Sequence, residues 1–453
     1  MSTSADYRAA VPHHNAITDS YLAEFAKTGI RPSELKEAVR ESTEDTTFQG
    51  RSLSRPVFLT KAQVTLLADD LERLHSALTG LPDRMFGGDM AAFAHAVGTT
   101  AEQAAAAVRG RMERPPRIGR ADFFLDETGF KLMEINWGSA VGGLDSGPLN
   151  KAMLAQPFVG DFVREHGLTY VDPMEALVDT LLTECAIPAG TRPVVALTDW
   201  PKSFEKLEPQ LHKSAAGLAP LGLDCYPCHV GQLEYRDGAV WLGERKIDVV
   251  YRLFLMEDLM DPTGPGLIEP VLRAAERGEV GIFAPMDAEL YGSKGALALL
   301  SDEANRHLYS VEELAALDRI LPWTRMVRPG PVTVDGSSVE LTDYALANRT
   351  ELILKPTLMH AGQGVLPGWT ADAGTWQDAV RDAMGEPFVL QRRVRSVPEV
   401  FPTDDGSEEW TLTWGAFMVS KGYGGMFMRG TLDPNATVNM ATGATGTCCF
   451  HEA

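Results

Sequence analysis

The stretch Gly119–Asn136, GRADFFLDETGFKLMEIN, decides how the rest of this sequence is interpreted. Two runs that alternate between apolar and polar residues flank Glu127-Thr128-Gly129, a pattern typical of an antiparallel β-hairpin. A three-residue loop with Gly129 in the left-handed conformation would place Asp126 opposite Phe130. The sequence therefore predicts two paired strands with a defined register.

This register places four polar side chains on one face of the hairpin. Asp122 is expected to face Glu134, and Arg120 to face Asn136, because strand side chains alternate with a period of two. The opposite face is expected to pack in a core and consists of apolar side chains: Ala121, Phe123, Leu125, Met133 and Ile135.

Two carboxylates that face each other across a hairpin repel, unless a cation lies between them. Mg²⁺ prefers oxygen ligands, and Asp122, Glu134 and the amide of Asn136 supply them. Arg120 beside them could hold phosphate oxygens. From the residues alone, a solvated acidic strand face remains an open alternative.

A second pattern lies in residues 351–368, ELILKPTLMHAGQGVLPG. An apolar strand carries Lys355 into a loop with Gly362 and Gly364, where backbone N–H groups could approach a phosphate. The P-loop pattern G-x-x-x-x-G-K-[ST] is absent from the chain. A plain strand-to-loop turn with a solvated lysine also fits this stretch.

Further polar residues interrupt apolar strands. GEPFVLQRRV predicts a buried strand that holds Gln391, and Arg429 and Arg252 each lie within apolar runs. A buried guanidinium needs a partner, which could be a protein carboxylate or a phosphate. Asn439 follows in the loop after the strand of Arg429.

Three regions are predicted along the chain. Residues 1–188 contain helical patterns at 61–81 and 90–112 and the hairpin. Residues 189–290 alternate short strands with helices, typical of a small α/β unit. Residues 291–453 begin with helices and continue as strands at 351–355, 388–392, 411–419 and 425–431. The predicted fold class is α+β.

The chain has 453 residues and a net charge of −21. Such an acidic protein repels phosphate backbones and anionic lipids, so neither nucleic acid nor a membrane is an expected partner. No signal peptide or apolar run of membrane-spanning length is visible, so a cytoplasmic location is predicted.

The segment Cys225-Tyr226-Pro227-Cys228-His229 fits the C-x-x-C-H pattern of haem attachment. Attachment requires export, and no export signal is seen. A zinc site would lack a fourth ligand. Structural thiols are the third interpretation and the one we favour for Cys225 and Cys228.

Several motifs together resemble the ATP-grasp ligases of the glutathionylspermidine synthetase-like, circularly permuted type. The matching segments span roughly residues 117–446: RADFFLDETGFKLMEINWGSAVGG, IDVVYRLF, YGSKGALALLSD, LPWTR, ILKP with AGQGVLPGW, EPFVLQRRV, and GGMFMRGTLDPNATVNMATGATG. The R-x-D then E-x-N spacing is the most specific feature. The resemblance implies an ATP-grasp fold in permuted order, with residues 189–290 as a pre-ATP-grasp unit and residues 291–453 as the nucleotide-binding region.

The resemblance also implies roles for individual residues. Asp122, Glu134 and Asn136 would bind Mg²⁺, while Arg120 and Arg429 would act in catalysis. ATP would contact Lys294, Lys355, Gly362, Gly364, Gln391 and Asn439. Independently of the resemblance, an acidic protein can hold a local basic pocket, in which Arg252 or Arg325 could bind a substrate carboxylate. Relatives usually carry an acidic residue after the strand lysine, where this chain has Thr357-Leu358-Met359-His360-Ala361.

The predicted function is ATP-dependent ligation of a small-molecule or peptide carboxylate to an amine through an acyl phosphate, with ADP and phosphate released. A small-molecule kinase and a non-catalytic nucleotide-binding scaffold are the alternatives. The sequence leaves open the substrates, the number of metal ions, the oligomeric state, the role of His360, and whether Phe450–Ala453 packs against the protein.

Overall fold

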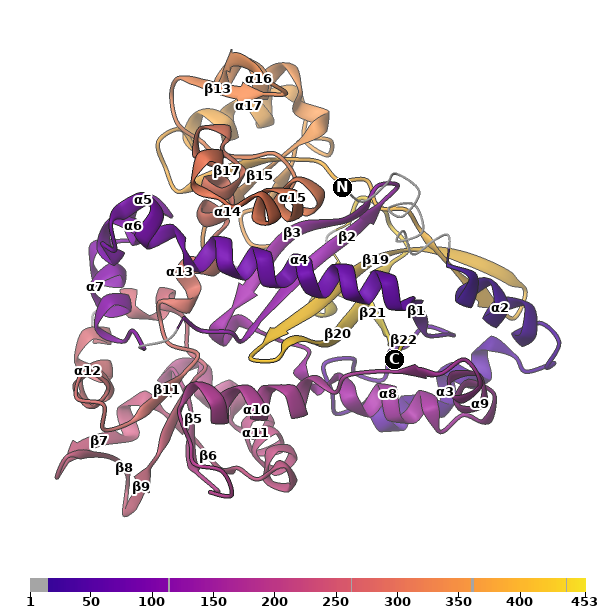
Figure 1. Cartoon of the computed structure of the whole chain (residues 1–453), viewed down its shortest axis with the longest axis horizontal. Coiled ribbons are helices and arrows are strands. Elements are labelled where there is room, and N and C mark those ends of the chain that lie inside the picture. Colours follow the sequence, from indigo (N-terminus) through magenta and orange to yellow (C-terminus); the bar gives the residue numbers. More distant parts are fainter. Residues whose placement is uncertain (1–14, 113–114, 262, 360–361, 437) are drawn as a thin grey trace.

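A computed structural model describes all residues except 1–14, 113–114, 262, 360–361 and 437. The fold is mixed α+β, as predicted. Figure 1 shows a central sheet with a smaller lobe above it, an α/β unit at the lower left and a group of helices at the right. Within the described residues, no helix combines the length and the apolar content needed to cross a bilayer.

The central sheet joins the predicted hairpin to the C-terminal part of the chain. Its strand order is β21-β20-β19-β2-β3, with β18 beside β19, and all of its pairs are antiparallel. The strands are β2 (Gly119–Asp126), β3 (Gly129–Trp137), β18 (Glu399–Thr403), β19 (Gly406–Val419), β20 (Gly422–Thr431) and β21 (Thr445–Thr447).

The hairpin register is confirmed at the functional end, although the predicted turn is wrong. Asp122 pairs with Glu134 and Arg120 with Asn136, but Asp126 pairs with Gly129 rather than with Phe130. The turn is one residue shorter than expected. An irregularity between Asp122 and Phe123 then shifts the register by one residue, so the predicted pairs form beyond it.

This irregularity changes one predicted core position. Leu132 is buried in the core, whereas Met133 is only half-buried and lines a cavity on the other face. Because a bulge adds one residue to one strand, it interrupts the alternation of faces there.

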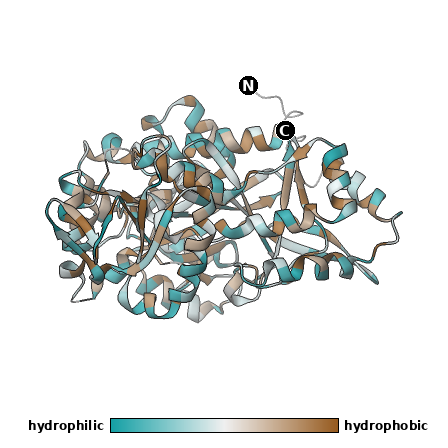
Figure 2. Ribbon diagram, turned by 90° about the horizontal axis from the view of Figure 1, so that it is seen from below, coloured by the Kyte–Doolittle hydropathy of each residue, from teal (hydrophilic) through white to brown (hydrophobic). Residues whose placement is uncertain are grey.

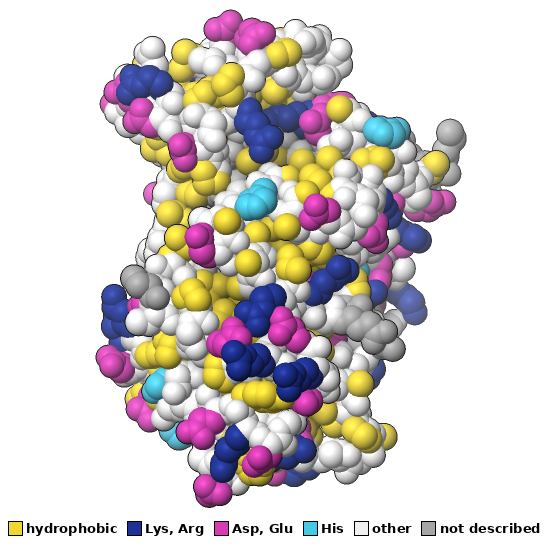
Figure 3. All heavy atoms as spheres, turned by 90° about the vertical axis from the view of Figure 1, so that its left-hand side faces the viewer, with side chains coloured by type: hydrophobic (Ala, Val, Ile, Leu, Met, Phe, Trp, Pro, Cys, Tyr) yellow, Lys and Arg dark blue, Asp and Glu magenta, His cyan; other side chains and the backbone are white. Residues whose placement is uncertain are grey.

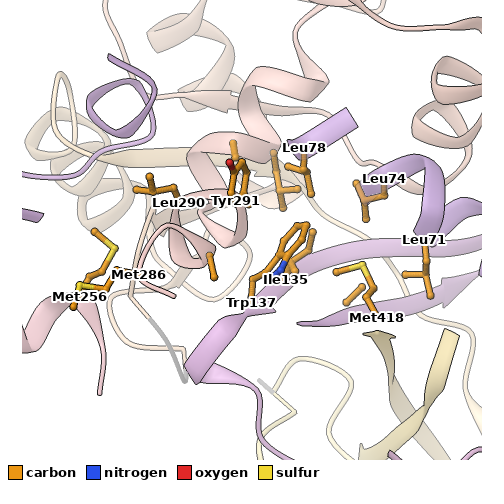
Figure 4. Packing of buried hydrophobic residues seen from close by; sticks show 14 of the residues in the cluster. Leu71, Leu74, Leu78, Ile135, Trp137, Met256, Met286, Leu290, Tyr291 and Met418 are labelled. Atoms are coloured by element: carbon orange, nitrogen blue, oxygen red, sulfur yellow. The ribbon is translucent and has the colours of Figure 1, made fainter. Parts of the chain in front are cut away.

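Helix α4 (Lys61–Thr79) covers the apolar face of the hairpin (Figure 1). Its leucines Leu71, Leu74 and Leu78 share one core with Ile135 and Trp137 of β3; in Figure 4 Leu78 lies above Ile135 and Trp137, and Leu71 lies near Met418. The polar face of the hairpin is thereby turned toward the smaller lobe. Nearby helices complete this layer: α5 (Leu81–Phe86), α6 (Met90–Ala96), α7 (Ala101–Arg109) and α13 (Ala288–Gly292).

The smaller lobe contains a four-stranded sheet of order β12-β17-β15-β16. Its core surrounds the buried Trp376. Its elements are α14 (Lys294–Ser301), α15 (Val311–Ile320), β12 (Thr324–Met326), β13 (Pro331–Val334), β14 (Ser337–Glu340), α16 (Leu341–Ala347), β15 (Leu352–Pro356), β16 (Leu366–Pro367), α17 (Ala373–Asp382) and β17 (Phe388–Arg392). The predicted strands at 351–355 and 388–392 are thus confirmed.

The α/β unit has a parallel sheet of order β11-β10-β5-β6, which falls within the predicted unit 189–290. Helix α11 follows β5 and α12 follows β10, as the predicted alternation of strands and helices requires, whereas β6 leads to β10 through the small antiparallel sheet β7-β8-β9. Its elements are α10 (Pro173–Glu184), β5 (Val194–Asp199), α11 (Pro201–Leu218), β6 (Asp224–His229), β7 (Leu233–Arg236), β8 (Ala239–Leu242), β9 (Arg245–Ile247), β10 (Val249–Arg252), α12 (Gly264–Glu276) and β11 (Gly281–Phe283).

The C-terminal residues answer a question that the sequence left open. Strand β22 pairs with β1 and β4, and Phe450 within it is fully buried. Figure 2 shows hydrophobic segments within the interior strands and hydrophilic turns outside. The remaining elements of this part are α2 (Ala16–Phe25), α3 (Pro32–Thr43), β1 (Val57–Leu59), α8 (Gly147–Leu154), α9 (Pro157–Glu165), β4 (Leu168–Thr169) and β22 (Cys449–Glu452).

Candidate functional site

The carboxylate of Asp122 lies at the centre of a cluster on the polar face of the central sheet. Arg120 donates to it from Nε at 2.7 Å and from Nη2 at 2.9 Å. Arg429 of β20 donates from Nη2 at 2.7 Å and from Nη1 at 3.4 Å. Asn136 adds an N–H at 3.1 Å. Five N–H groups therefore converge on one carboxylate that is 1% exposed.

The electrostatics of this cluster follow from its ion pairs. Burial alone would raise the pKa of Asp122, but the guanidiniums of Arg120 and Arg429 hold the pKa well below its usual range. Burial lowers the pKa of Arg120, and the charge of Asp122 more than compensates, so this pKa is raised. Asp122 and Arg120 are therefore both charged at neutral pH.

Glu134 lies beside this cluster, and Lys294 is the largest of the charges that stabilise its carboxylate. Lys294 Nζ is 3.5 Å from Glu134 Oε2 and also donates to the carbonyl oxygen of Met359 at 3.0 Å. Burial favours the neutral carboxylic acid, but the charges of Lys294 and Lys355 contribute to a lowered pKa of Glu134. Its side chain remains 30% exposed, so it is accessible to a ligand.

Lys355 projects from β15 toward the hairpin. Its Nζ donates to Gln391 Oε1 at 2.7 Å and to the Met133 carbonyl oxygen at 3.2 Å. Gln391 is in turn fixed by a hydrogen bond to Thr324 Oγ1 at 3.2 Å. Burial of the ammonium lowers the pKa of Lys355 to about 8, although the charge of Glu134 acts in the opposite direction.

Two cavities meet at this group of side chains. The inter-sheet cavity, about 320 Å³, lies between the central sheet and the smaller sheet and is lined by Asp122, Glu134, Ile353 and Lys355 among others. The Arg120 cavity, about 470 Å³, is lined by Arg120, Asn136 and Ser139 among others. The residues that line both cavities are Glu134, Gly362, Arg429 and Val438.

The oxygen donors present fit a magnesium ion only in part. Asp122 already accepts five hydrogen bonds, more than the roughly four lone-pair positions of a carboxylate. Glu134 and the side-chain oxygen of Asn136 lie two residues apart on one face of β3. They would suffice for Mg²⁺, which commonly takes one or two protein ligands together with phosphate oxygens and water. In the described residues no group of three or more His, Cys, Asp or Glu could hold a metal.

The remaining predicted ligand-binding residues differ in position. Gly362 lines both cavities, and Asn439 lines the Arg120 cavity. Gly364 has a positive φ of 67° and a Cβ there would meet Pro356 at 2.7 Å, so it shapes the loop. The buried Gln391 orients Lys355 and lines neither cavity. His360 lies outside the described residues.

The two arginines predicted to bind a substrate carboxylate lie elsewhere. Arg252 is 1% exposed and pairs with Glu289 at 2.5 Å. It also donates to the carbonyl oxygens of Phe254, Ala284 and Pro285. Arg325 pairs with Glu303. Neither arginine lines the inter-sheet cavity or the Arg120 cavity, so we do not place them in the site.

Sequence reasoning missed two features of the site. At Gly415 of β19, a Cβ would lie 2.8 Å from Arg120 Cδ and 3.0 Å from Asp122 Oδ1, so a glycine there admits the cluster. A glycine inside an apolar strand is the signal that could have indicated this. The Arg393 guanidinium lies 4.1 Å from the ring centre of Trp369, and both side chains line the inter-sheet cavity.

Cys225 and Cys228 are on β6 and are free thiols. Burial raises the pKa of Cys225 to about 12 and that of Cys228 to about 11. Cys228 contacts Thr198 Oγ1 at 3.5 Å in the interior of the α/β unit. These environments favour the interpretation as structural thiols.

Comparison with known proteins gives similarity at the level of structure. No protein-family description and no curated protein matches this sequence. The structure is similar to that of a glutathione synthetase-like effector from Globodera pallida in its apo form, with a TM-score of 0.53 and 11% identity over 92% of this chain and 96% of that chain. The chain has a glutathione synthetase-like fold. A candidate gamma-glutamylcysteine synthetase from Methylobacillus flagellatus also matches, with a TM-score of 0.42 and 13% identity over 85% of this chain and 87% of that chain.

Proposed function

We propose that this protein is an ATP-dependent ligase of the ATP-grasp type that joins a carboxylate to an amine. The observation that carries the proposal is a cluster beside the two cavities, in which four cationic side chains surround only two carboxylates; Arg120, Arg429 and Lys355 line the cavities, and Lys294 lies behind Glu134. Arg120, Arg429, Lys294 and Lys355 leave an excess of positive charge that suits a polyphosphate. In an acidic protein this local excess is informative.

The inter-sheet cavity is the proposed nucleotide site. Lys355 lines this cavity and supplies charge for phosphates, while Lys294 adds charge from its place 3.5 Å from Glu134. Ile353 and Trp369 offer apolar surface for a purine. The buried indole N–H of Trp369 has no hydrogen-bond partner among the described residues, and would be satisfied by a ligand acceptor. The Arg120 cavity then holds the carboxylate to be activated.

In the proposed reaction a carboxylate oxygen attacks the γ-phosphorus of ATP, the bond to the β-phosphate breaks and ADP leaves. The amine nitrogen then attacks the acyl carbon, the bond to phosphate breaks, and the amine loses a proton. Arg120 and Arg429, held by Asp122, stabilise charge on the transferring phosphoryl group. Glu134 and Asn136 would hold Mg²⁺, which supplies further neutralisation of that charge.

One observation favours a second candidate, a nucleotide-binding protein without turnover. Related ligases usually carry an acidic residue in the loop after the strand lysine, whereas this chain has none in Thr357–Met359. Lys294 donates instead to the backbone carbonyl oxygen of Met359 in that loop. Calorimetric titration with Mg·ATP detects binding in either case, whereas only a ligase releases ADP. A small-molecule kinase would release ADP but retain the phosphate on its product.

The test is an ADP-release screen with the full chain over amino acids, dipeptides and polyamines. Glu134→Gln and Lys355→Ala should each reduce ADP release at least a hundredfold while the protein stays folded by circular dichroism. Normal activity in either variant would remove the site assignment. AMP with pyrophosphate as the nucleotide products would instead indicate an adenylating mechanism.

A further inference from the structure

A third cavity continues from the Arg120 cavity into the α/β unit. This apolar cavity, about 540 Å³, lies between α10, α11 and β10 on one side and α8 on the other. Thr47, Val141, Gly143 and Leu253 line both it and the Arg120 cavity, so the two spaces share a wall. A substrate held in one cavity can therefore extend into the other.

The walls of the apolar cavity have a different chemical character from the Arg120 cavity. Buried apolar side chains line its interior: Leu177, Leu197, Leu211, Leu218 and Tyr251. Leu253 follows the carboxyl end of β10, the position where ligands commonly bind in parallel α/β sheets. Its volume lies within the usual range of small-molecule sites, about 300–1,000 Å³.

Both lysines at the rim of the apolar cavity have carboxylate partners within the protein, and Glu175 adds a further carboxylate there. Lys151 pairs with Asp172 at 3.1 Å, and Lys213 pairs with Asp45. Asp145 accepts hydrogen bonds from Thr47 at 2.6 and 2.8 Å. Figure 3 shows that basic and acidic side chains are also interspersed on another face of the molecule. Because both lysines are already paired, the rim offers little to an anionic substrate body.

We propose that the carboxylic acid substrate carries an elongated apolar body, aliphatic or aromatic, that fills the apolar cavity while its carboxylate lies in the Arg120 cavity. This inference rests on the proposed function for the identity of the reacting group. The polarity of the two cavities fixes the orientation, because the guanidiniums of Arg120 and Arg429 line one cavity and suit a carboxylate, whereas the leucine walls of the other suit hydrocarbon. Polar acids such as small dipeptides would leave the apolar cavity unfilled.

The experiment measures binding of straight-chain monocarboxylic acids with four to ten carbons to the full chain by calorimetry in the presence of Mg·ADP. Each added methylene should lower Kd roughly fourfold until the cavity is filled. A Kd that does not change with chain length would overturn the proposal.

Leu253→Trp places a large ring at the shared wall and should abolish the dependence on chain length while nucleotide binding persists. Leu207→Trp, at an exposed position of α11 outside all three cavities, is the matched control and should keep that dependence. If Leu253→Trp does not fold, Gly217→Trp at the rim of the apolar cavity replaces it, since a Cβ there meets no atom within 4 Å. An unchanged length dependence in a folded blocking variant would also overturn the proposal.

A separate measurement distinguishes this proposal from the proposed function. Hydroxylamine traps acyl phosphates as hydroxamates, so ATP with each acid and hydroxylamine reports activation without the natural amine. Hydroxamate that forms equally from short and long acids supports the ligase and contradicts the apolar substrate. Tight, length-dependent binding without hydroxamate supports the apolar site and contradicts the ligase. If apolar amines rather than acids show the length dependence, the assignment of the acid to this cavity is wrong.

Discussion

Replacing Asp122 with asparagine distinguishes two roles of this carboxylate: positioning Arg120 and Arg429, or binding Mg²⁺ directly. The substitution keeps the shape of the side chain but removes the charge that holds Arg120 and Arg429. Both arginines are less than 10% exposed, so two buried guanidiniums lose their partner. Breaking a buried ion pair in this way costs about 3–5 kcal/mol, a large part of the roughly 5–15 kcal/mol that stabilise a typical domain.

Urea unfolding at pH 7 measures this loss as a lower midpoint with an unchanged slope. At that pH the contribution of Asp122 is fully present. Its pKa is lowered in the folded state, so the stabilisation exists above the unfolded pKa of about 3.9 and disappears as the pH falls through the folded value. Asp126→Asn, in the exposed turn of the same hairpin, is the control and should change stability by about 0.5 kcal/mol or less. If Asp122→Asn is as stable as the wild type and instead weakens the dependence of ADP release on Mg²⁺, Asp122 is a metal ligand and the positioning role is refuted.

Three further predictions follow from burial and charge. Nucleotide affinity should weaken as the pH rises from 7 to 9, because the Lys355 ammonium, with a pKa of about 8, loses its proton. Lys355→Arg should remove this pH dependence, since arginine keeps its proton over this range. A wild-type affinity that calorimetry finds unchanged between pH 7 and 9 contradicts the prediction. Burial raises the pKa of Asp287 to about 7, so the folded state binds more protons than the unfolded state and urea midpoints should fall as the pH rises from about 4 to 7. Asp287→Asn should flatten this slope, and an unchanged slope would show that other groups cause it. Gly415→Ala should lower the free energy of unfolding by about 1–3 kcal/mol and should also lower ADP release. The reason is that the added Cβ would lie 2.8 Å from both Arg120 Cδ and the Phe427 carbonyl oxygen. A fully stable and active variant would show that the cluster does not need a glycine at this position.

The hairpin shows how far a period-two pattern can be used. The sequence predicted that Asp122 and Glu134 face each other, and this pairing is confirmed although the predicted turn is one residue too long. The shorter turn and the single irregularity in strand pairing compensate each other, so the pairs beyond the irregularity are the predicted ones. The error appears only between these two features, where Met133 lines the inter-sheet cavity and Leu132 is in the core. The residues of the turn could not predict the position of the irregularity, because no residue typical of a β-bulge marks it in the sequence.

The neutralisation of the two carboxylates could not be predicted from the hairpin. Opposed carboxylates implied a cation, and a metal was the cation that the local sequence suggested. Arg429, which supplies much of the charge at Asp122, is 307 residues away in sequence and reaches it only because β19 lies between β20 and β2. Likewise, Glu134 meets Lys294 from α14 of the smaller lobe. Partners brought together by tertiary structure are not visible to spacing arguments within one segment.

Arg252 and Arg429 show what a buried arginine in an apolar strand does and does not indicate. The same reasoning required a partner for each, and the structure provides Glu289 for Arg252 and Asp122 for Arg429. The pair of Arg252 is enclosed by backbone carbonyl groups and reaches neither the inter-sheet cavity nor the Arg120 cavity. Arg429, in contrast, lines both of these cavities. Burial and pairing are therefore common to a structural and a functional arginine. What separates them is whether the guanidinium, besides being held by its carboxylate, also borders a space that a ligand can enter.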